Sequence, residues 1–209
     1  QSRGLGDVYK RQDRDFYCYI YTNSLEFPST THISIVDEYG NALSMTSTIE
    51  SSFGSRLMTN GGFLLNNELT DFSFQKEKKG KRVANNIEPN KRPRSSMAPT
   101  IIFKNDKPLF IIGSPGGSNI IGYVVNSIIG LVDWKMNVQQ AASIPHGINK
   151  FGTFYLEKNS KISSLKKQLE KKGYKVKLRN FYSGLNIIQI KKKLFGGSDH
   201  RREGVAIGY

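Results

Sequence analysis

Alternating apolar and polar positions near the start of the chain predict a two-stranded hairpin. Residues 33–36 are mainly apolar, and residues 43–48 alternate between apolar or small side chains and hydroxyl side chains. The turn Glu38-Tyr39-Gly40-Asn41 separates the two segments. A glycine-containing turn between two segments of period 2 is typical of a β-hairpin.

A second hairpin and a buried helix are predicted in the middle of the chain. The apolar segments 100–103 and 109–112 flank a polar turn at residues 105–108. The glycine-rich turn 114–118 follows, and then the apolar stretch 120–132. This stretch is shorter than the ~20 residues that a membrane span needs, so we expect a buried helix.

Two more helices and further strands complete the predicted order. The side chain of Asn137 can cap a helix that begins at the next residue. Apolar residues recur on one face of the segment 161–172, and Gly173 can end that helix. Further strands are predicted at 61–65, 176–178 and 186–190, and a polar surface loop at 73–94. Strands, then helices, then strands predict an α+β layered fold.

Composition narrows the class of protein. The chain has 209 residues, of which 37% are hydrophobic, and it carries a formal net charge of +14. There is no collagen period or sustained heptad, and Cys18 has no partner for an internal disulfide. The charge would suit a nucleic-acid-binding protein. The basic residues are scattered in short runs, however, which favours a solvated lysine-rich surface and no nucleic-acid partner.

The first residues do not resemble the rest of a folded domain. Residues 1–12 have the character of a non-native tag or a sequencing artefact, and we set them aside. The absence of an initiator Met indicates a fragment. Residues 13–29 are predicted to be an extended, exposed lead-in, because Pro28 favours an extended conformation at the preceding residue.

The pair Thr30-Thr31 carries chemistry only under one condition. A threonine hydroxyl is a weak nucleophile unless a base lies beside it. If the peptide bond before a threonine is cut, the new α-amino group is such a base, because its pKa of about 7.7–8.0 leaves much of it neutral. Without further information, ordinary strand threonines remain the simpler interpretation.

Several motifs in a fixed order change that interpretation. They are TTHISIVDEYGNALSMTSTIESSFG, GGFLLNNELTDF, PNKRPRSSMAPTII, IIGSPGGSNII and GGSDHRREG. Through them, residues 30–209 resemble the small catalytic subunit of gamma-glutamyltransferase, an N-terminal nucleophile hydrolase. The resemblance implies the small-subunit half of an αββα four-layer sandwich, and cleavage of the Ser29–Thr30 bond, which would remove residues 13–29 as the end of the large subunit or a linker.

The resemblance also implies roles for individual residues. Thr30 is the expected nucleophile, and Thr48 is expected to hydrogen-bond its hydroxyl. The backbone N–H groups of Gly116 and Gly117 are expected to stabilise the oxyanion of acyl transfer. A γ-glutamyl group carries an ammonium and a carboxylate on one carbon, so its site needs both acceptors and donors. The expected acceptors for the ammonium are Glu50, Glu68 and Asp71, and the expected donors to the carboxylate are Ser95 and Ser96.

Other polar residues are given structural roles. We reject His32 as a base, because the amine already serves and neighbouring strand residues face opposite sides. We expect His146 and His200 to be structural or exposed, and no metal site. Compared with the family, Arg94 replaces an apolar residue, His146 follows Pro145 where arginine is common, and residues 73–88 form a shorter loop, which implies an open site.

The predicted function is γ-glutamyl transfer or hydrolysis without a cofactor. The donor would be glutathione or a related compound, and the acyl group would pass to water or to an amino acid or peptide. The resemblance implies a large subunit of the same precursor as partner, and a periplasmic or extracellular location. One alternative is a related acylase acting on γ-glutamyl or glutaryl side chains, and a basic nucleic-acid-binding protein is a remote one.

Overall fold

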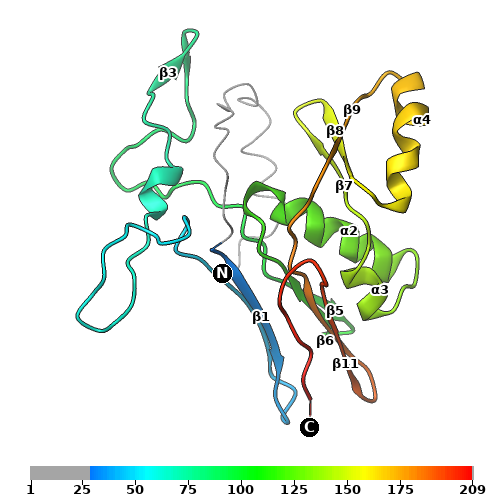
Figure 1. The fold of residues 1–209 in the computed structure, drawn as a ribbon. Helices are drawn as coiled ribbons and strands as arrows, with labels where there is room; N and C mark the ends of the chain where they lie inside the picture. The colour runs from blue at the N-terminus through cyan, green and yellow to red at the C-terminus, as the bar shows by residue number, and fades with distance from the viewer. Residues whose placement is uncertain (1–28, 209) are drawn as a thin grey trace.

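A four-stranded antiparallel sheet forms the centre of the molecule (Figure 1). The computed structural model describes residues 29–208, so the segments 1–12 and 13–28 lie outside the described residues. The strand order is β11-β10-β6-β5. The strands are β5 (Thr100–Lys104), β6 (Lys107–Gly113), β10 (Asn186–Ile190) and β11 (Leu194–Ser198). The prediction of a hairpin at β5 and β6 is confirmed.

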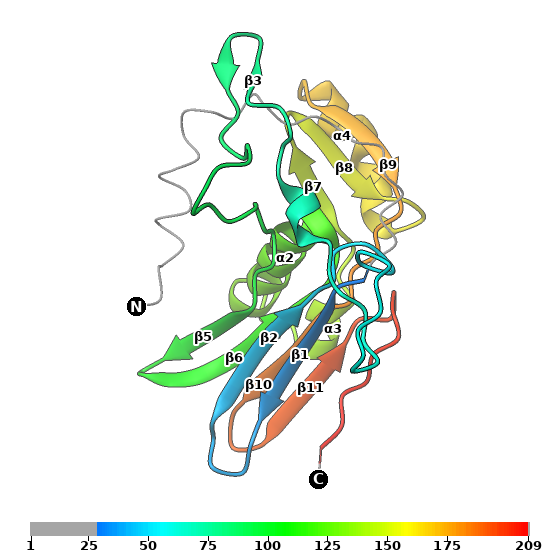
Figure 2. The same cartoon turned by 90° about the vertical axis from the view of Figure 1, so that its left-hand side faces the viewer.

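The first predicted hairpin is also confirmed, and it stacks on one face of the central sheet (Figure 2). It consists of β1 (Thr31–Val36) and β2 (Ala42–Ser47). Its polar side faces the sheet, because Ser34 Oγ donates to the carbonyl of Asn186 and Ser44 Oγ donates to that of Ile112. The apolar side chains of the hairpin are 41–47% exposed on the opposite face: Ile33, Ile35, Leu43 and Met45.

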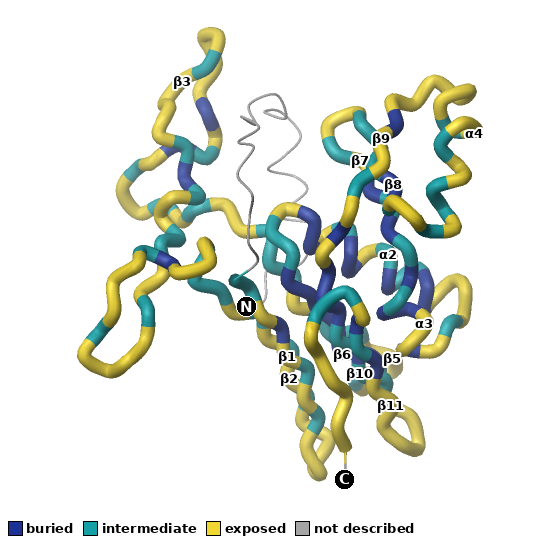
Figure 3. The backbone as a smooth tube through the Cα atoms, viewed as in Figure 1, coloured by how far each residue is buried: buried dark blue, intermediate teal, exposed yellow. Residues whose placement is uncertain are grey.

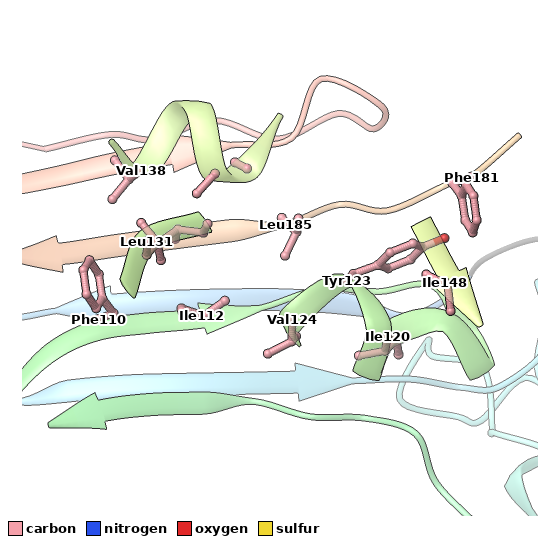
Figure 4. Packing of buried hydrophobic residues seen from close by; sticks show 13 residues of the cluster. Phe110, Ile112, Ile120, Tyr123, Val124, Leu131, Val138, Ile148, Phe181 and Leu185 are labelled. Carbon is pink, nitrogen blue, oxygen red and sulfur yellow. The ribbon is translucent and has the colours of Figure 1, made fainter. Parts of the chain in front are cut away.

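Helices cover the other face of the central sheet. Helix α2 (Ile120–Val132) follows a 3-10 turn at Gly117–Asn119, and α3 is Val138–Ala142. Asn137 caps α3 in a reciprocal pair of hydrogen bonds with Gln140, as its position predicts. Residues of α2, α3, β6 and β10 form most of the hydrophobic core, and Ile148, Phe181 and Leu185 complete it (Figure 4). Among residues 29–208, no helix combines the length and apolar character needed to cross a membrane.

A smaller unit follows the helices. Its three-stranded sheet has the order β7-β8-β9, in which β8 and β9 are parallel. The elements are β7 (Gly147–Lys150), β8 (Thr153–Glu157), the 3-10 helix Lys161–Leu165, α4 (Lys166–Lys171) and β9 (Lys175–Arg179). The α+β class is confirmed. The layers run helix, sheet, sheet, which is the small-subunit part of the αββα sandwich.

Residues 48–99 form a long connection with little regular structure, which we call the 48–99 connection. It contains a 3-10 helix at Glu68–Asp71 and the short strands β3 (Glu77–Lys78) and β4 (Lys81–Arg82). Most of it is exposed (Figure 3). The residues within it that are buried are Gly54, Phe72, Val83 and Asn86.

Three sequence predictions about these elements need correction. Residues 61–65 are not a strand: a single bridge joins Met58 to Leu64, because a turn at Gly61-Gly62 interrupts the segment. The predicted helix 161–172 is split into a 3-10 part and α4, since Ser163 and Ser164 hydroxyls bond to carbonyls three residues back. Strands β7, β8 and β11 were not predicted, and neither were the two-residue strands β3 and β4 in the segment predicted to be a loop.

Candidate active site

The two threonines of the predicted catalytic pair lie opposite each other at the open end of the β1–β2 hairpin. Thr31 pairs with Ser47, so the antiparallel register places Thr30 opposite Thr48. The two hydroxyl oxygens, Thr30 Oγ1 and Thr48 Oγ1, are 3.0 Å apart. The N–H of Glu50 donates to Thr48 Oγ1 at 3.0 Å, which leaves the Thr48 hydrogen free to point at Thr30.

His32 is a structural residue. Its ring is buried against Gly113, and its nitrogens lie 2.8 Å from Thr46 Oγ1 and 3.1 Å from Ser34 Oγ. Burial lowers the pKa of His32 to about 4. Because both ring nitrogens of His32 lie within hydrogen-bond distance of Thr46 and Ser34, neither is directed at Thr30. Alternation along the strand does not exclude His32, however, because residues two apart face the same side of a strand, and Thr30 and His32 are two apart.

The three predicted acids gather around the 3-10 helix of the 48–99 connection. Glu50 has a left-handed backbone with φ of 69°, and Asn67 Nδ2 donates to its Oε2 at 3.0 Å. Burial, followed by the charges of Asp71 and Glu50, raises the pKa of Glu68. Glu68 Oε2 is buried and has no hydrogen-bond partner among the described residues. A cation would relieve this concentration of negative charge.

The predicted serines lie on the extended segment that leads into β5. Ser95 is exposed and Ser96 is half-buried, and Ser95 Oγ accepts a hydrogen bond from the N–H of Met97 at 3.2 Å. Just before them, the N–H of Arg94 donates to Asn85 Oδ1 at 3.0 Å, and Asn85 Nδ2 donates to the carbonyl of Asp71 at 2.6 Å. Asn85 therefore ties the serine segment to the acid segment.

The glycine turn between β6 and α2 has a backbone that favours glycine. Gly116 has φ of 138° and Gly117 has φ of 54°. A Cβ at Gly116 would lie 2.4 Å from the ring of Tyr123, so a side chain there would clash as well as strain the backbone. The turn thus presents bare backbone, which is what an oxyanion site requires.

Arg202 binds the backbone of Thr30, and sequence reasoning missed it. Its Nη1 donates to the carbonyl of Thr30 at 3.3 Å, and its Nε donates to the carbonyl of Tyr182 at 3.0 Å. A Cβ built on Gly184 would lie 3.1 Å from Arg202 Cδ and 2.9 Å from Pro115 Cγ. Arg201 and Arg202 both belong to the GGSDHRREG motif, and this motif was the sequence signal that could have identified them as site residues.

The same motif is anchored by a buried polar network. Arg201 donates to Glu157 at 2.7 Å and to Asp199 at 2.9 Å. Ser183 Oγ donates to Asp199 and lies 2.8 Å from His146 Nε2. Burial lowers the pKa of His146 to about 3. The expectation that His146 is structural is confirmed, and His200 is exposed. Within residues 29–208, no cluster of His, Cys, Asp or Glu could hold a metal ion.

Comparison with known proteins places this geometry in a family. The family model described as gamma-glutamyltranspeptidase matches residues 8–209. The chain is 37% identical over 185 residues to the glutathione hydrolase proenzyme of Bacillus subtilis (strain 168), covering 86% of this chain and 30% of the relative. It is 36% identical over 195 residues to that of Escherichia coli (strain K12), covering 88% and 33%.

A solved structure agrees with the sequence matches. The crystal structure of a threonine-to-alanine mutant of Helicobacter pylori gamma-glutamyltranspeptidase superimposes with a TM-score of 0.74 at 39% identity. The match covers 82% of this chain and 100% of that chain. The chain spans about a third of the length of the curated relatives it matches. With the family model matching nearly all of it, the chain belongs to the gamma-glutamyltranspeptidase family.

Proposed function

We propose that this chain is the catalytic part of an enzyme that transfers or hydrolyses γ-glutamyl groups. The observation that carries the proposal is the 3.0 Å contact between the hydroxyls of Thr30 and Thr48 at the start of β1. In a member of this family, that contact supplies a nucleophile and the group that orients it. The relatives are named as proenzymes, which supports activation by cleavage.

Cleavage of the Ser29–Thr30 bond would create the catalytic base. While the bond is intact, the nitrogen of Thr30 is an amide and cannot accept a proton. The freed α-amine has a pKa of about 7.7–8.0 and can take the hydroxyl proton. Thr30 Oγ1 then attacks the γ-carbonyl carbon, the amide C–N bond breaks, and the amine leaves with a proton. Water or an acceptor amine resolves the resulting ester.

Two parts of the chain would stabilise and select the donor. The amides of Gly116 and Gly117 would bind the oxyanion, where removal of one donor costs about 2.7–4 kcal/mol. Glu50, Glu68 and Asp71 would bind the ammonium, and Ser95 with Ser96 would bind the carboxylate. A glutaryl group has no ammonium, so the acid cluster favours a γ-glutamyl donor such as glutathione over the acylase alternative.

The remaining part of the precursor is the proposed partner. The β1–β2 hairpin exposes Ile33, Ile35, Leu43 and Met45 on its outer face, and the 48–99 connection exposes several large apolar side chains. Exposed apolar surface of this extent is characteristic of an interface. We infer a heterodimer in which residues 30–209 are the small subunit. The proposed acceptor of the acyl group is an amino acid or a peptide, and the proposed reaction uses no cofactor.

The test uses the full precursor expressed from its complete coding sequence. Thr30→Ala should abolish both self-cleavage and hydrolysis of a γ-glutamyl anilide, because one hydroxyl serves both reactions. Thr30→Ser keeps a hydroxyl and should retain both at a lower rate. Intact mass and release of the aniline are followed together over time. Turnover by Thr30→Ala, or by precursor that is still uncut, would refute the proposed mechanism.

A further inference from the structure

Asn85 joins two segments that are distant in sequence. Its Nδ2 donates to the carbonyl of Asp71, fourteen residues earlier, and its Oδ1 accepts from the N–H of Arg94, nine residues later. The partners fix the orientation of the amide, since a carbonyl can only accept and an N–H can only donate. One side chain therefore determines how the two backbone segments lie relative to each other.

The backbone of Asn85 is held as firmly as its side chain. Its carbonyl accepts from the N–H of Ser73 at 2.8 Å, and the carbonyl of Ser73 accepts from the N–H of Ile87 at 3.3 Å. These bonds close the base of the loop that carries β3 and β4. Asn85 thus lies at a fixed point between the acid segment and the serine segment.

We propose that Asn85 is a positioning residue for the amino-acid end of the substrate. It holds the Asp71 segment and the Ser95-Ser96 segment at the separation needed to bind the ammonium and the carboxylate of one γ-glutamyl group. This proposal rests on the function proposed above. Asn85 itself touches the two backbones and not the reacting atoms, so its effect should appear in recognition and not in acyl chemistry.

Hydrogen-bond chemistry explains why an amide suits this position. Aspartate has the same shape and can accept from the N–H of Arg94, but it presents an acceptor to the carbonyl of Asp71. Asn85→Asp therefore breaks one of the two bonds and keeps the other, while Asn85→Ala breaks both. The neighbouring Asn86 is a matched control: it is buried and bonds to Glu88 and Lys91, and these two residues form no part of the proposed site.

The experiment compares two donors in the full, self-cleaved enzyme. A γ-glutamyl anilide needs both recognition segments, and a glutaryl anilide lacks the ammonium. Asn85→Ala should raise KM for the γ-glutamyl donor about 5- to 30-fold. The rate of self-cleavage and kcat/KM for the glutaryl donor should change by less than about twofold. Asn86→Ala should shift the thermal midpoint and leave the ratio of the two donors unchanged.

The outcomes separate this proposal from the proposed function. Three results would overturn the role of Asn85. The first is an equal loss of kcat/KM on both donors, and the second is no change on either donor. The third is a change in the donor ratio of Asn86→Ala that equals the change in Asn85→Ala. If Asn85→Ala does not accumulate, the ratio of kcat/KM for the two donors is measured in Asn85→Asp instead. Failure of both variants to self-cleave would show that Asn85 is purely structural. A wild-type precursor that does not hydrolyse the γ-glutamyl anilide would refute the proposed function itself.

Discussion

The body of two stacked sheets and the 48–99 connection are organised by different kinds of contact. In the body, β-ladders, a helical layer and a continuous hydrophobic core hold the strands and helices in place. In the connection, exposed side chains dominate, and side chain-to-backbone bonds such as those of Asn85 fix the path of the chain. The proposed nucleophile lies on the body, while the acids and serines proposed to read the substrate lie on the connection. Under the proposed function, chemistry and recognition would therefore be supported by separable structures.

The largest effect should follow from separating the two sheets. A Cβ at Gly113 would lie 2.0 Å from the ring of His32, so Gly113→Ala forces β6 away from β1. Overpacking costs about 1–3 kcal/mol and occasionally more, and we expect loss of self-cleavage together with a thermal midpoint lowered by several degrees.

Gly40→Asn is the control for Gly113→Ala. A Cβ there meets nothing within 4 Å, and asparagine tolerates the positive φ of that turn. Both variants are compared by thermal shift and intact mass. A Gly113→Ala precursor that cleaves and melts like wild type would show that the sheets are not held in contact at this point.

A smaller and more selective effect is expected in the connection. Asp71→Ala should raise KM for a γ-glutamyl donor, because a charge-assisted hydrogen bond contributes roughly 1.5–3 kcal/mol, or about 10- to 150-fold. Self-cleavage needs no ammonium and should proceed as in wild type. Glu77→Ala removes an exposed acid of the same connection and should leave KM unchanged. Slow self-cleavage with normal KM would mean that Asp71 supports the fold instead.

The body was more predictable from sequence than the smaller unit. Period-2 alternation and a glycine turn were sufficient to predict β1 and β2, and a mainly apolar stretch of helical length was sufficient to predict α2. In the smaller unit, β7 and β8 were not predicted. Within the body, β11 was missed because its glycines lack side chains that favour a strand. They are required by a tertiary contact, since a Cβ at Gly197 would lie 2.7 Å from the backbone of Val138. Such close approaches leave no local pattern in the sequence.

The site shows the same limit. The family motifs identified residues with recognisable chemistry, and Thr30 and Thr48 are in contact as expected. Asn85 and Arg202 were missed because their partners are backbone carbonyls and an N–H of distant segments. Nothing in the local sequence distinguishes an asparagine that bridges two segments from one that ends a turn.

The smallest expected effect is the contribution of Glu68 to the pH dependence of stability, which differs in sign from that of the body. Burial lowers the pKa of His32 to about 4 and that of His146 to about 3, from an ordinary 6.5. Between these values the unfolded chain binds protons that the folded body does not, so stability is lost as pH falls below 6.5. Glu68 contributes to the pH dependence of stability with the opposite sign. Its pKa is raised above 4.5 by burial and by nearby carboxylates, so stability falls as pH rises above that value.

Glu68→Gln separates the two contributions. It should leave the acid limb of the thermal midpoint in place, because the histidines of the body remain. At neutral pH it should raise the midpoint slightly, by the equivalent of less than about 1 kcal/mol, since solvent screens a half-exposed carboxylate. Midpoints of wild type and Glu68→Gln are measured from acid to neutral pH in the self-cleaved enzyme without substrate. Equal stabilisation at both ends of that range would show that the carboxylate of Glu68 is not strained by its neighbours.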